Sequence, residues 1–424
     1  MKVLVIGNGG RESAICWKLF NSNKVSKIYI APGNGGTLNY GENIDISVDN
    51  IVELKKFAVN NKIDLTVVGP EIPLTLGIVD EFGKDGLKIF GPSKEAAELE
   101  GSKDFAKKIM KKYKIPTADY ETFTEYEEAL KYLKNKGVPI VIKADGLAAG
   151  KGVTVAFNID DAINALKDIM LDKIFGESGA KVVIEEYMDG EEASILAFTD
   201  GKTIYPMVSS QDHKRIYDGD KGPNTGGMGT YSPAPVVTDE VYKMVYNDIL
   251  VPMIKGLKEE GIKYKGVLYA GLMISGKEVK VVEFNVRFGD PETQVVLPRL
   301  KTDLFEVFEA VAEEKLDKIK LEWDDRVAVC VVMASGGYPG KYEKEKLITG
   351  IKEAEENGLL VFHAGTKDEN GKVTTNGGRV LDVVSIKDNI KAAVDDIYNK
   401  IDSINFENKF YRKDIAHKAL KRES

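Results

Sequence analysis

Residues 281–292, with the sequence VVEFNVRFGDPE, join a run of valines to a set of polar side chains. The valines predict a buried strand whose end carries Glu283 and Asn285. Side chains two positions apart point to the same face of a strand. A carboxylate and an amide oxygen on one face suit Mg²⁺, which takes few protein oxygens and leaves its other positions to water and phosphate. We therefore predict a metal site at Glu283 and Asn285.

Arg287, Asp290 and Glu292 crowd the turn directly after this strand. Charges at a strand end usually form solvated ion pairs that contribute little to stability. Here an arginine and two acids meet a Gly-Asp-Pro turn beside the predicted metal, so we favour a functional site. These three residues are candidates for catalysis and for substrate binding.

The composition describes an ordinary globular protein of several domains. A chain of 424 residues is too long for one core, and roughly two to four domains are expected. The net charge of −8 argues against non-specific binding to nucleic acid or to a membrane surface. No apolar run approaches the length of a membrane span. Local clusters of Lys and Arg can still bind small anionic substrates.

Cysteine and histidine are both rare in this chain. Cys16 and Cys330 each lie in an apolar run, which predicts buried free thiols and a reducing compartment. Two cysteines and three histidines make a zinc site improbable. The first residues turn into a glycine loop too early for a signal peptide. We expect a cytoplasmic, monomeric protein without nucleic-acid or membrane partners.

Residues 1 to about 100 alternate short apolar strands with helices, a rhythm that predicts a Rossmann-like parallel sheet. The first turn contains Gly9, Gly10 and Arg11 and leads into a helix, where N–H groups and the helix dipole favour an anion. A dinucleotide is disfavoured, because Glu12 stands at the third glycine position and the sequence APGN replaces the expected acid after the second strand. A bound phosphate and a tight turn without ligand are both compatible with this motif.

The glycine-rich loop at residues 144–152 joins two predicted strands. It is not a Walker A loop, because only three residues separate its first glycine from Gly150 and because Gly152 replaces Ser or Thr. Its N–H groups and Lys151 can instead close over phosphates as a flap. Lys143 ends the preceding strand, where a lysine can also simply extend into solvent. A predicted helix over residues 94–114 carries several further lysines, most of them on a solvated face.

The polar segment at residues 209–231 reads as a long loop, which is uncommon in a compact domain unless it is functional. His213 alone is better explained as a surface or hydrogen-bonded residue than as a catalytic base. Its neighbours Asp212 and Lys214 make recognition of an anion worth considering. Beyond residue 321 a smaller α+β unit is expected, and it contains a second glycine turn with the sequence NGGR at residues 376–379.

Taken together, these motifs resemble the glycinamide ribonucleotide synthetase (phosphoribosylamine–glycine ligase) family of the ATP-grasp superfamily. The resemblance runs almost end to end, and RFGDPETQ at residues 287–294 is its most specific element. It implies a Rossmann-like domain at 1–102, an ATP-grasp domain at 103–322 with a lid at about 117–188, and a C-terminal α+β domain at 323–424. One departure is that the strand at 267–274 lacks the second metal-binding acid of many ATP-grasp proteins, so the number of metals stays open.

The resemblance implies that ATP, glycine and 5-phosphoribosylamine give glycinamide ribonucleotide, ADP and phosphate through glycyl phosphate, with Mg²⁺ or Mn²⁺. Implied ATP-binding residues are Lys103, Lys143, Gly150, Lys151, Gly152, Glu185, Glu186, Tyr187 and Glu192. Lys103 and Lys143 would hold phosphates, the strand end at 185–187 would meet adenine, and Glu192 would accept from the ribose. Implied substrate-binding residues are Gly9, Gly10, Arg11, Asp212, Lys214, Arg287, Asp290, Glu292, Asn376, Gly377, Gly378 and Arg379. Of these, Arg287, Asp290, Glu292 and Asp212, together with Lys151, would be catalytic.

Two other functions are open to the same sequence. A different ATP-grasp ligase, such as a carboxylase that activates bicarbonate, would release ADP without glycine. A nucleotide-binding regulator would bind ATP without turnover. The RFGDPE motif argues against the first, and retention of Glu283, Asn285 and Lys151 argues against the second.

Overall fold

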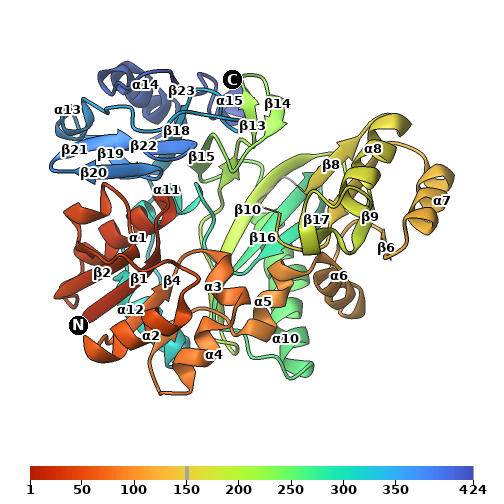
Figure 1. The fold of residues 1–424 in the computed structure, drawn as a ribbon, viewed down its shortest axis with the longest axis horizontal. Helices are drawn as coiled ribbons and strands as arrows, with labels where there is room; N and C mark the ends of the chain where they lie inside the picture. The colour runs from red at the N-terminus through yellow and green to blue at the C-terminus, as the bar shows by residue number, and fades with distance from the viewer. Residues whose placement is uncertain (149–151, 424) are drawn as a thin grey trace.

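A computed structural model describes residues 1–148 and 152–423 (Figure 1). The N-terminal region forms a five-stranded parallel sheet in the order β3-β2-β1-β4-β5, which confirms the predicted Rossmann-like layer. The strands of this sheet are β1 (Lys2–Gly7), β2 (Lys27–Pro32), β3 (Glu42–Asn43), β4 (Leu65–Val68) and β5 (Ile89–Phe90). Its helices are α1 (Gly10–Phe20), α2 (Ile51–Asn60), α3 (Glu71–Thr75), α4 (Ile78–Gly83) and α5 (Lys94–Gly101).

The helix predicted over residues 94–114 is two helices, because the chain breaks at Ser102. This residue has extended backbone angles and accepts a hydrogen bond from the N–H of Phe105, so it caps α6 (Lys103–Lys112). The expectation of one continuous helix was therefore wrong. The break places Lys103 in the first turn of α6.

A four-stranded antiparallel sheet in the order β11-β10-β16-β17 forms the centre of the molecule. Its strands are β10 (Glu191–Thr199), β11 (Ile204–Pro206), β16 (Gly266–Ser275) and β17 (Glu278–Asn285). Helices α9 (Asp239–Met244) and α10 (Val251–Glu259) are joined by a π-helical turn at Val245–Leu250. Helices α11 (Thr293–Val296) and α12 (Leu304–Ala312) follow the sheet.

The region predicted as a lid forms a small unit at the right of Figure 1, with a four-stranded sheet in the order β6-β9-β7-β8. Its elements are β6 (Tyr120–Phe123), α7 (Tyr126–Lys136), β7 (Ile140–Ala144), β8 (Val153–Ala156), α8 (Ile159–Met170) and β9 (Val182–Glu186). Buried side chains such as Leu133, Ile142 and Leu166 give it a hydrophobic core of its own. Of the predicted flap, Gly150 and Lys151 lie outside the described residues.

The C-terminal sheet has the order β12-β15-β18-β22-β19, with β23 paired to β18. It consists of β12 (Gln211–Asp212), β15 (Gly229–Ser232), β18 (Val327–Ser335), β19 (Leu360–His363), β22 (Arg379–Lys387) and β23 (Lys409–Phe410). Two hairpins lie beside it. One pairs β13 (Arg215–Tyr217) with β14 (Lys221–Asn224), and the other pairs β20 (Thr366–Glu369) with β21 (Lys372–Thr375). Helices α13 (Ile351–Glu356), α14 (Ile390–Lys400) and α15 (His417–Glu423) complete this region.

The polar segment at 209–231, expected to be a loop, contains four short strands. Two of them, β12 and β15, pair with the C-terminal sheet rather than with the central one. The predicted boundaries at residues 102 and 322 stay predictions. The pairing nevertheless means that the central region and the C-terminal sheet are built from interleaved parts of the chain.

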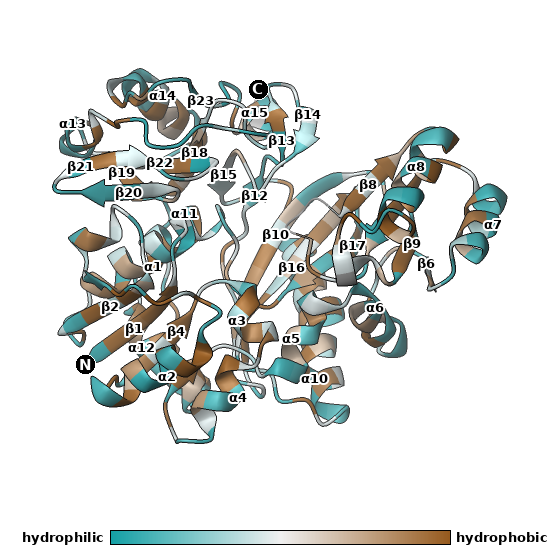
Figure 2. Cartoon of the chain, viewed as in Figure 1, coloured by the Kyte–Doolittle hydropathy of each residue, from teal (hydrophilic) through white to brown (hydrophobic). Residues whose placement is uncertain are grey.

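Apolar residues concentrate on the strands in the middle of the molecule, and polar residues cover the outer helices (Figure 2). One buried cluster joins the N-terminal and central sheets, and a second joins the N-terminal sheet, the central sheet and β18. Burial of apolar surface of this kind is the main favourable term in folding. In the described parts of the chain, no helix is long and apolar enough to cross a membrane.

Candidate active site

Six polar or small residues share one face of the central sheet. Tyr269 lies opposite Asn285 on β17, and Gly271 lies between Ser194 on β10 and Glu283 on β17. Because side chains alternate along each strand, these residues and Glu192 face the same side. The two residues predicted to bind a metal therefore lie on this face. Ser194, Tyr269 and Gly271 were not among the residues predicted from the sequence.

The Glu283 carboxylate lies where three lysines converge. Burial alone would raise its pKa, but Lys214, Lys143 and Lys103 outweigh burial and lower the pKa below its ordinary value. The residue is therefore ionised at neutral pH. Residues 1–148 and 152–423 hold no group of three or more His, Cys, Asp and Glu side chains that could bind a metal. A cation at Glu283 and Asn285 would thus need oxygens from a phosphate and from water, a ligand set that fits Mg²⁺ or Mn²⁺ bound with a nucleotide.

Lys143 and Lys103 line the approach to this face from the lid and from α6. Lys143 Nζ lies 2.8 Å from Glu185 Oε2 and donates to Val282 O at 3.3 Å. Lys103 Nζ donates to Gly146 O at 3.1 Å, and burial lowers its pKa. Gly152 is buried directly before β8. The binding of phosphates by these two lysines stays a prediction.

Lys107 is a buried exception among the lysines of α6. Its Nζ lies 3.2 Å from Glu185 Oε2, and burial lowers its pKa to about 8. The other carboxylate oxygen of Glu185 is buried without a hydrogen-bond partner among the described residues. Glu186 is exposed and pairs with Lys280 at 3.0 Å, and the Tyr187 ring lies 5.3 Å from that of Phe157. Of the predicted adenine contacts, Glu185 thus points inward and Glu186 outward.

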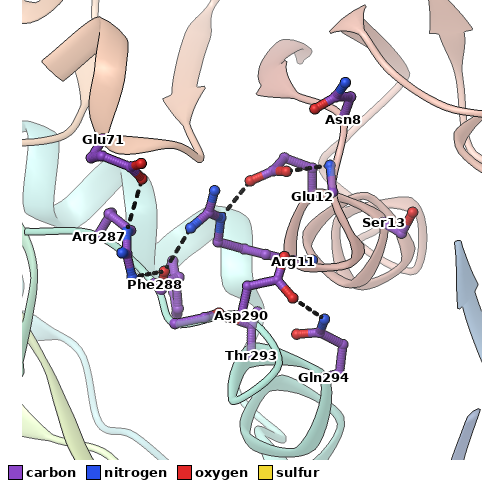
Figure 3. Close-up of polar contacts among 12 residues, drawn as sticks. Asn8, Arg11, Glu12, Ser13, Glu71, Arg287, Phe288, Asp290, Thr293 and Gln294 are labelled. Atoms are coloured by element: carbon purple, nitrogen blue, oxygen red, sulfur yellow. Dashed lines mark hydrogen bonds and ion pairs between the residues drawn. The ribbon is translucent and has the colours of Figure 1, made fainter. Parts of the chain in front are cut away.

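The N-terminal glycine turn meets the RFGDPE loop, although the two are almost 280 residues apart (Figure 3). Arg11 donates through Nη1 to Phe288 O at 3.0 Å and through its backbone N–H to Asp290 Oδ2 at 3.3 Å. Burial alone would raise the pKa of Asp290, but Arg379 and Arg11 lower it below its ordinary value. The structure therefore brings Arg11, Asp290 and Arg379 together, and their binding of a substrate stays a prediction.

Two carboxylates already occupy the start of α1. Glu12 accepts a hydrogen bond from the N–H of Gly9 at 2.6 Å, and its side chain packs against Gly7 and Gly69. This capping role explains why an acid stands at the third glycine position. A Cβ on Gly10 would lie 1.8 Å from Asp382 Oδ2, so only glycine fits there. The binding of a phosphate at Gly9 and Gly10 stays a prediction.

Arg287 is held by two acids from the N-terminal region. Its guanidinium lies 2.7 Å from Glu100 Oε1 and 3.3 Å from Glu71 Oε2, and it also donates to Phe288 O at 3.2 Å. Figure 3 shows its side chain turned toward Glu71. These contacts tie the RFGDPE loop to α3 and α5. The loop position is thus set by residues that sequence reasoning did not single out.

Asp212 and Lys214 lie over the sheet face. Lys214 Nζ pairs with Glu192 Oε2 at 2.6 Å. Burial and the nearby Glu292 raise the pKa of Asp212 well above its ordinary value. A cavity of about 10 Å³ separates these side chains from the strands beneath them, and Tyr269 and Gly271 are among its lining residues. Asp212, Lys214 and Glu192 are therefore brought together.

His213, between these two residues, is a structural residue. Its Nδ1 lies 3.1 Å from Gly229 O, and Nε2 accepts a hydrogen bond from the N–H of Ala416 at 3.2 Å. Burial lowers its pKa to about 3. Since both ring nitrogens have partners and the ring stays neutral, His213 is not available as a base.

The C-terminal glycine turn contributes Arg379 to the site. Arg379 Nη1 donates to Gly226 O at 2.9 Å and to Asp290 O at 2.8 Å, and it lies 3.3 Å from Asp290 Oδ1. Gly377 and Gly378 accept hydrogen bonds from Ser335 through their carbonyl groups. Asn376 is exposed. Of the predicted quartet, only Arg379 reaches the RFGDPE loop through its side chain.

The arrangement of lid, central sheet and N-terminal sheet defines an ATP-grasp protein. Biotin carboxylase from Campylobacter jejuni, at 16% identity and a TM-score of 0.72, has the same fold over 97% of this chain and 93% of its own. Models of phosphoribosylglycinamide synthetase match the chain as an N domain at residues 1–100, an ATP-grasp domain at 101–293 and a C domain at 328–418. The chain belongs to the phosphoribosylglycinamide synthetase family.

Individual relatives match over the full chain. Phosphoribosylamine–glycine ligase of Escherichia coli is 52% identical over 427 residues, which cover 100% of both chains. The same-named protein of Halalkalibacterium halodurans is 52% identical over 99% of this chain and 97% of its own. The crystal structure of phosphoribosylamine–glycine ligase from Thermotoga maritima has a TM-score of 0.84 and 34% identity, covering 98% of this chain and 100% of that one.

Proposed function

We propose that this protein is an ATP-dependent ligase that joins glycine to 5-phosphoribosylamine, giving glycinamide ribonucleotide, ADP and phosphate in purine biosynthesis. The observation that carries the proposal is the end-to-end match, at about half identity, to relatives named phosphoribosylamine–glycine ligase. Membership of an ATP-grasp family supports the use of ATP. The charged face of the central sheet supplies groups for this chemistry.

The reaction would pass through glycyl phosphate. A carboxylate oxygen of glycine attacks the γ-phosphorus of ATP, and ADP leaves. The amine of phosphoribosylamine then attacks the glycyl carbonyl carbon, phosphate leaves, and the amine nitrogen loses a proton. Phosphoryl transfer depends mainly on positioning and on neutralising charge. Lys103 and Lys143 would meet the phosphates, and closure of the lid would keep water from the acyl phosphate.

Glu283 and Asn285 would hold Mg²⁺ or Mn²⁺, which when bound neutralises charge on the ATP phosphates. Glu192 would accept from the ribose hydroxyls, and the strand end at 185–187 would meet the adenine. Arg11 and Arg379, which flank Asp290, would bind the phosphate of phosphoribosylamine. These assignments are supported by the shared sheet face of Glu192, Glu283 and Asn285 and by the contacts of Arg11 and Arg379 with Asp290.

Lys214 and Asp212 are our candidates for the two ends of glycine. A zwitterion needs a cation for its carboxylate and a carboxylate for its ammonium group, and these two side chains lie over the same cavity. Burial and Glu292 raise the pKa of Asp212, and an ammonium group bound beside it would favour its ionised form. The ion pairs of Arg287 with Glu71 and Glu100 favour a role in positioning the loop that carries Asp290 and Glu292. We also propose that the protein acts as a monomer in the cytoplasm. Light scattering after size-exclusion chromatography tests whether the protein is a monomer.

The proposal is tested by measuring ADP release with Mg²⁺-ATP, adding glycine and freshly formed phosphoribosylamine separately and together. We expect release only when both are present, with labelled glycine recovered in the product. Release without glycine would indicate another carboxylate substrate, such as bicarbonate. Binding of ATP without any release of ADP would indicate a regulator rather than an enzyme.

A further inference from the structure

A cavity about the size of one water molecule lies on the face of the central sheet that carries Glu192, Glu283 and Asn285, called the active face below. Its volume is about 10 Å³, and its walls include Asp212, Lys214, Ser194, Tyr269 and Gly271. A space of this size admits roughly one small polar group. Resting on the function proposed above, we propose that Ser194, Tyr269 and Gly271 form the floor of the glycine pocket and exclude amino acids that carry a side chain.

The charges around the cavity match an amino acid zwitterion. Lys214 and Asp212 come from the segment above the sheet, and Ser194 and Tyr269 add hydroxyl groups from β10 and β16. Buried polar groups that are placed to meet one ligand discriminate strongly against ligands that leave them unpaired. Glu192 also lines the cavity and pairs with Lys214 at 2.6 Å, and the other lining residues, Ala193, Leu272 and Val282, are apolar. The cavity thus offers polar partners to one end of glycine and leaves no room for a side chain.

A chain of hydroxyl groups connects the cavity to the RFGDPE loop. The hydroxyls of Ser194 and Tyr269 lie 2.7 Å apart, and Tyr269 donates to Glu292 Oε1 at 2.9 Å. Glu292 is buried, with 4% of its surface exposed. Because a buried carboxylate oxygen is costly to leave without a donor, Tyr269 fixes the position of Glu292. The floor residues Ser194 and Tyr269 and the RFGDPE loop therefore form one hydrogen-bonded unit.

Gly271 places the empty side of the pocket next to the predicted metal site. A Cβ built on this residue would lie 3.4 Å from Glu283 Cγ and 3.5 Å from Tyr269 Cε1, which is ordinary contact. Its backbone is not in the left-handed region, so alanine can be accommodated there without strain. The added methyl group would lie between Tyr269 and Glu283. A carboxylate that receives the γ-phosphoryl group would lie beside the phosphates held at Glu283, and Gly271, which lines the cavity, lies opposite Glu283.

We would test the inference with Gly271→Ala and Tyr269→Phe, and with Ser275→Ala at the exposed end of the same strand as a matched control. Steady-state assays would give the KM for glycine and the KM for ATP separately. Calorimetric titration of glycine, in the presence of Mg²⁺ and a non-hydrolysable ATP analogue, would measure binding without turnover. We expect both pocket variants to raise the KM and the Kd for glycine by about tenfold or more. The KM for ATP should change by less than about twofold. The control variant should match the wild type.

Unchanged glycine affinity in both pocket variants would overturn the inference while leaving the proposed function intact. A rise in the KM for ATP instead of glycine would also overturn it, and would assign the cavity to the nucleotide. If wild-type protein neither bound glycine nor released ADP in its presence, the proposed function itself would be wrong. Circular dichroism of each variant would establish that the fold is retained.

Discussion

Glu283 is the single side chain on which the proposed chemistry depends most. Three lysines keep it ionised on the active face, opposite Gly271. Glutamine keeps the shape of the side chain but removes its charge. We predict that Glu283→Gln lowers kcat by at least about a hundredfold, because charge on the phosphates would no longer be neutralised through the metal.

The measurement for Glu283→Gln is ADP release at saturating substrates, with fluorescence titration of an adenine nucleotide as the companion assay. Nucleotide binding should stay measurable, since the proposed adenine contacts at residues 185–187 lie at the end of the lid strand β9 and not at Glu283. Chelation of divalent cations should abolish activity of the wild-type protein, and added Mg²⁺ should restore it. Full activity in the variant would remove Glu283 from the metal site.

Asp382 is a second buried acid, on β22 beside the start of α1. Gln294 Nε2 donates to it and to Asp290 at 2.9 Å each, and burial followed by repulsion from Asp290 raises the pKa of Asp382 to about 7. Its folded pKa is above the unfolded value of 3.8, so its contribution to stability is complete below that value. The contribution is lost as pH rises toward 7, by about 1.4 kcal/mol per pH unit.

We therefore predict that Asp382→Asn, which resembles the protonated acid, gains stability relative to the wild type as pH rises from about 4 to 7. The difference in the free energy of unfolding should level off above pH 7. Urea unfolding of both proteins at a series of pH values measures it. A constant difference across this range would show that Asp382 is ionised in the folded protein throughout.

The segment at 209–231 is the element that carries Asp212 and Lys214 over the sheet. It is attached to the C-terminal region through His213, which accepts a hydrogen bond from the N–H of Ala416 at 3.2 Å, and through Arg412, which pairs with Asp220 at 2.9 Å. Arg412, Asp220 and Lys418 are the charged groups that act on the buried ring. The neutral ring is thus a fixed part of the element.

Protonation of His213 should loosen this element. Because its folded pKa of about 3 lies below the unfolded value of 6.5, its contribution to stability is present above pH 6.5 and is lost as pH falls from 6.5 toward 3. We predict that His213→Gln, whose amide oxygen can accept from Ala416, lowers stability at pH 7 and reduces the pH dependence between 5 and 6.5 by about 1.4 kcal/mol per pH unit. His363, with a pKa lowered to about 4, contributes in the same direction in both proteins.

The measurement for His213 is urea unfolding at pH 5, 6 and 7. An equal pH dependence in variant and wild type would show that the ring is protonated in the folded protein. The KM for glycine should rise in the variant at pH 7, because Asp212 and Lys214 flank the altered residue.

The sequence was informative wherever a local period determines geometry. Glu283 and Asn285 are two residues apart on a strand, and alternation alone places them together. Ser194 and Tyr269 obey the same alternation, but uncharged residues in apolar strands look like core residues. Lys107 was hidden in a lysine-rich helix, because its burial depends on Glu185 almost 80 residues later.

Contacts between distant segments could not be predicted from local patterns. The ion pairs of Arg287 join residues that are 216 and 187 positions apart, and no period in the sequence reports them. The same holds for β15, which pairs with β18, a strand about 100 residues later in the chain. Short polar strands of this kind read as loops until their partner strand is known.

At the scale of the whole molecule, the N-terminal and central sheets share a core. The rings of Phe90, Phe198, Phe288 and Phe308 pack together, with centroids between 4.2 and 6.5 Å apart. Phe288 belongs to the RFGDPE loop, so the packing of this core also positions the site. The lid has its own core and does not contribute to this aromatic cluster.

We predict that Phe308→Ala destabilises the N-terminal and central regions together, by about 3–5 kcal/mol. Any loss of activity should follow loss of folded protein or displacement of the RFGDPE loop, because the Phe308 ring packs against Phe288 of that loop. Hydrogen exchange followed by mass spectrometry should show faster exchange in β1, β4, β10 and β16 as one unit, while α7 and α8 of the lid keep their wild-type rates. Phe157→Ala on the exposed side of the lid is a suitable control, because its side chain lies outside all the buried clusters. Faster exchange limited to β5 and α12 would show instead that the two sheets open independently, and that the shared core does not couple the nucleotide side of the site to the N-terminal glycine turn.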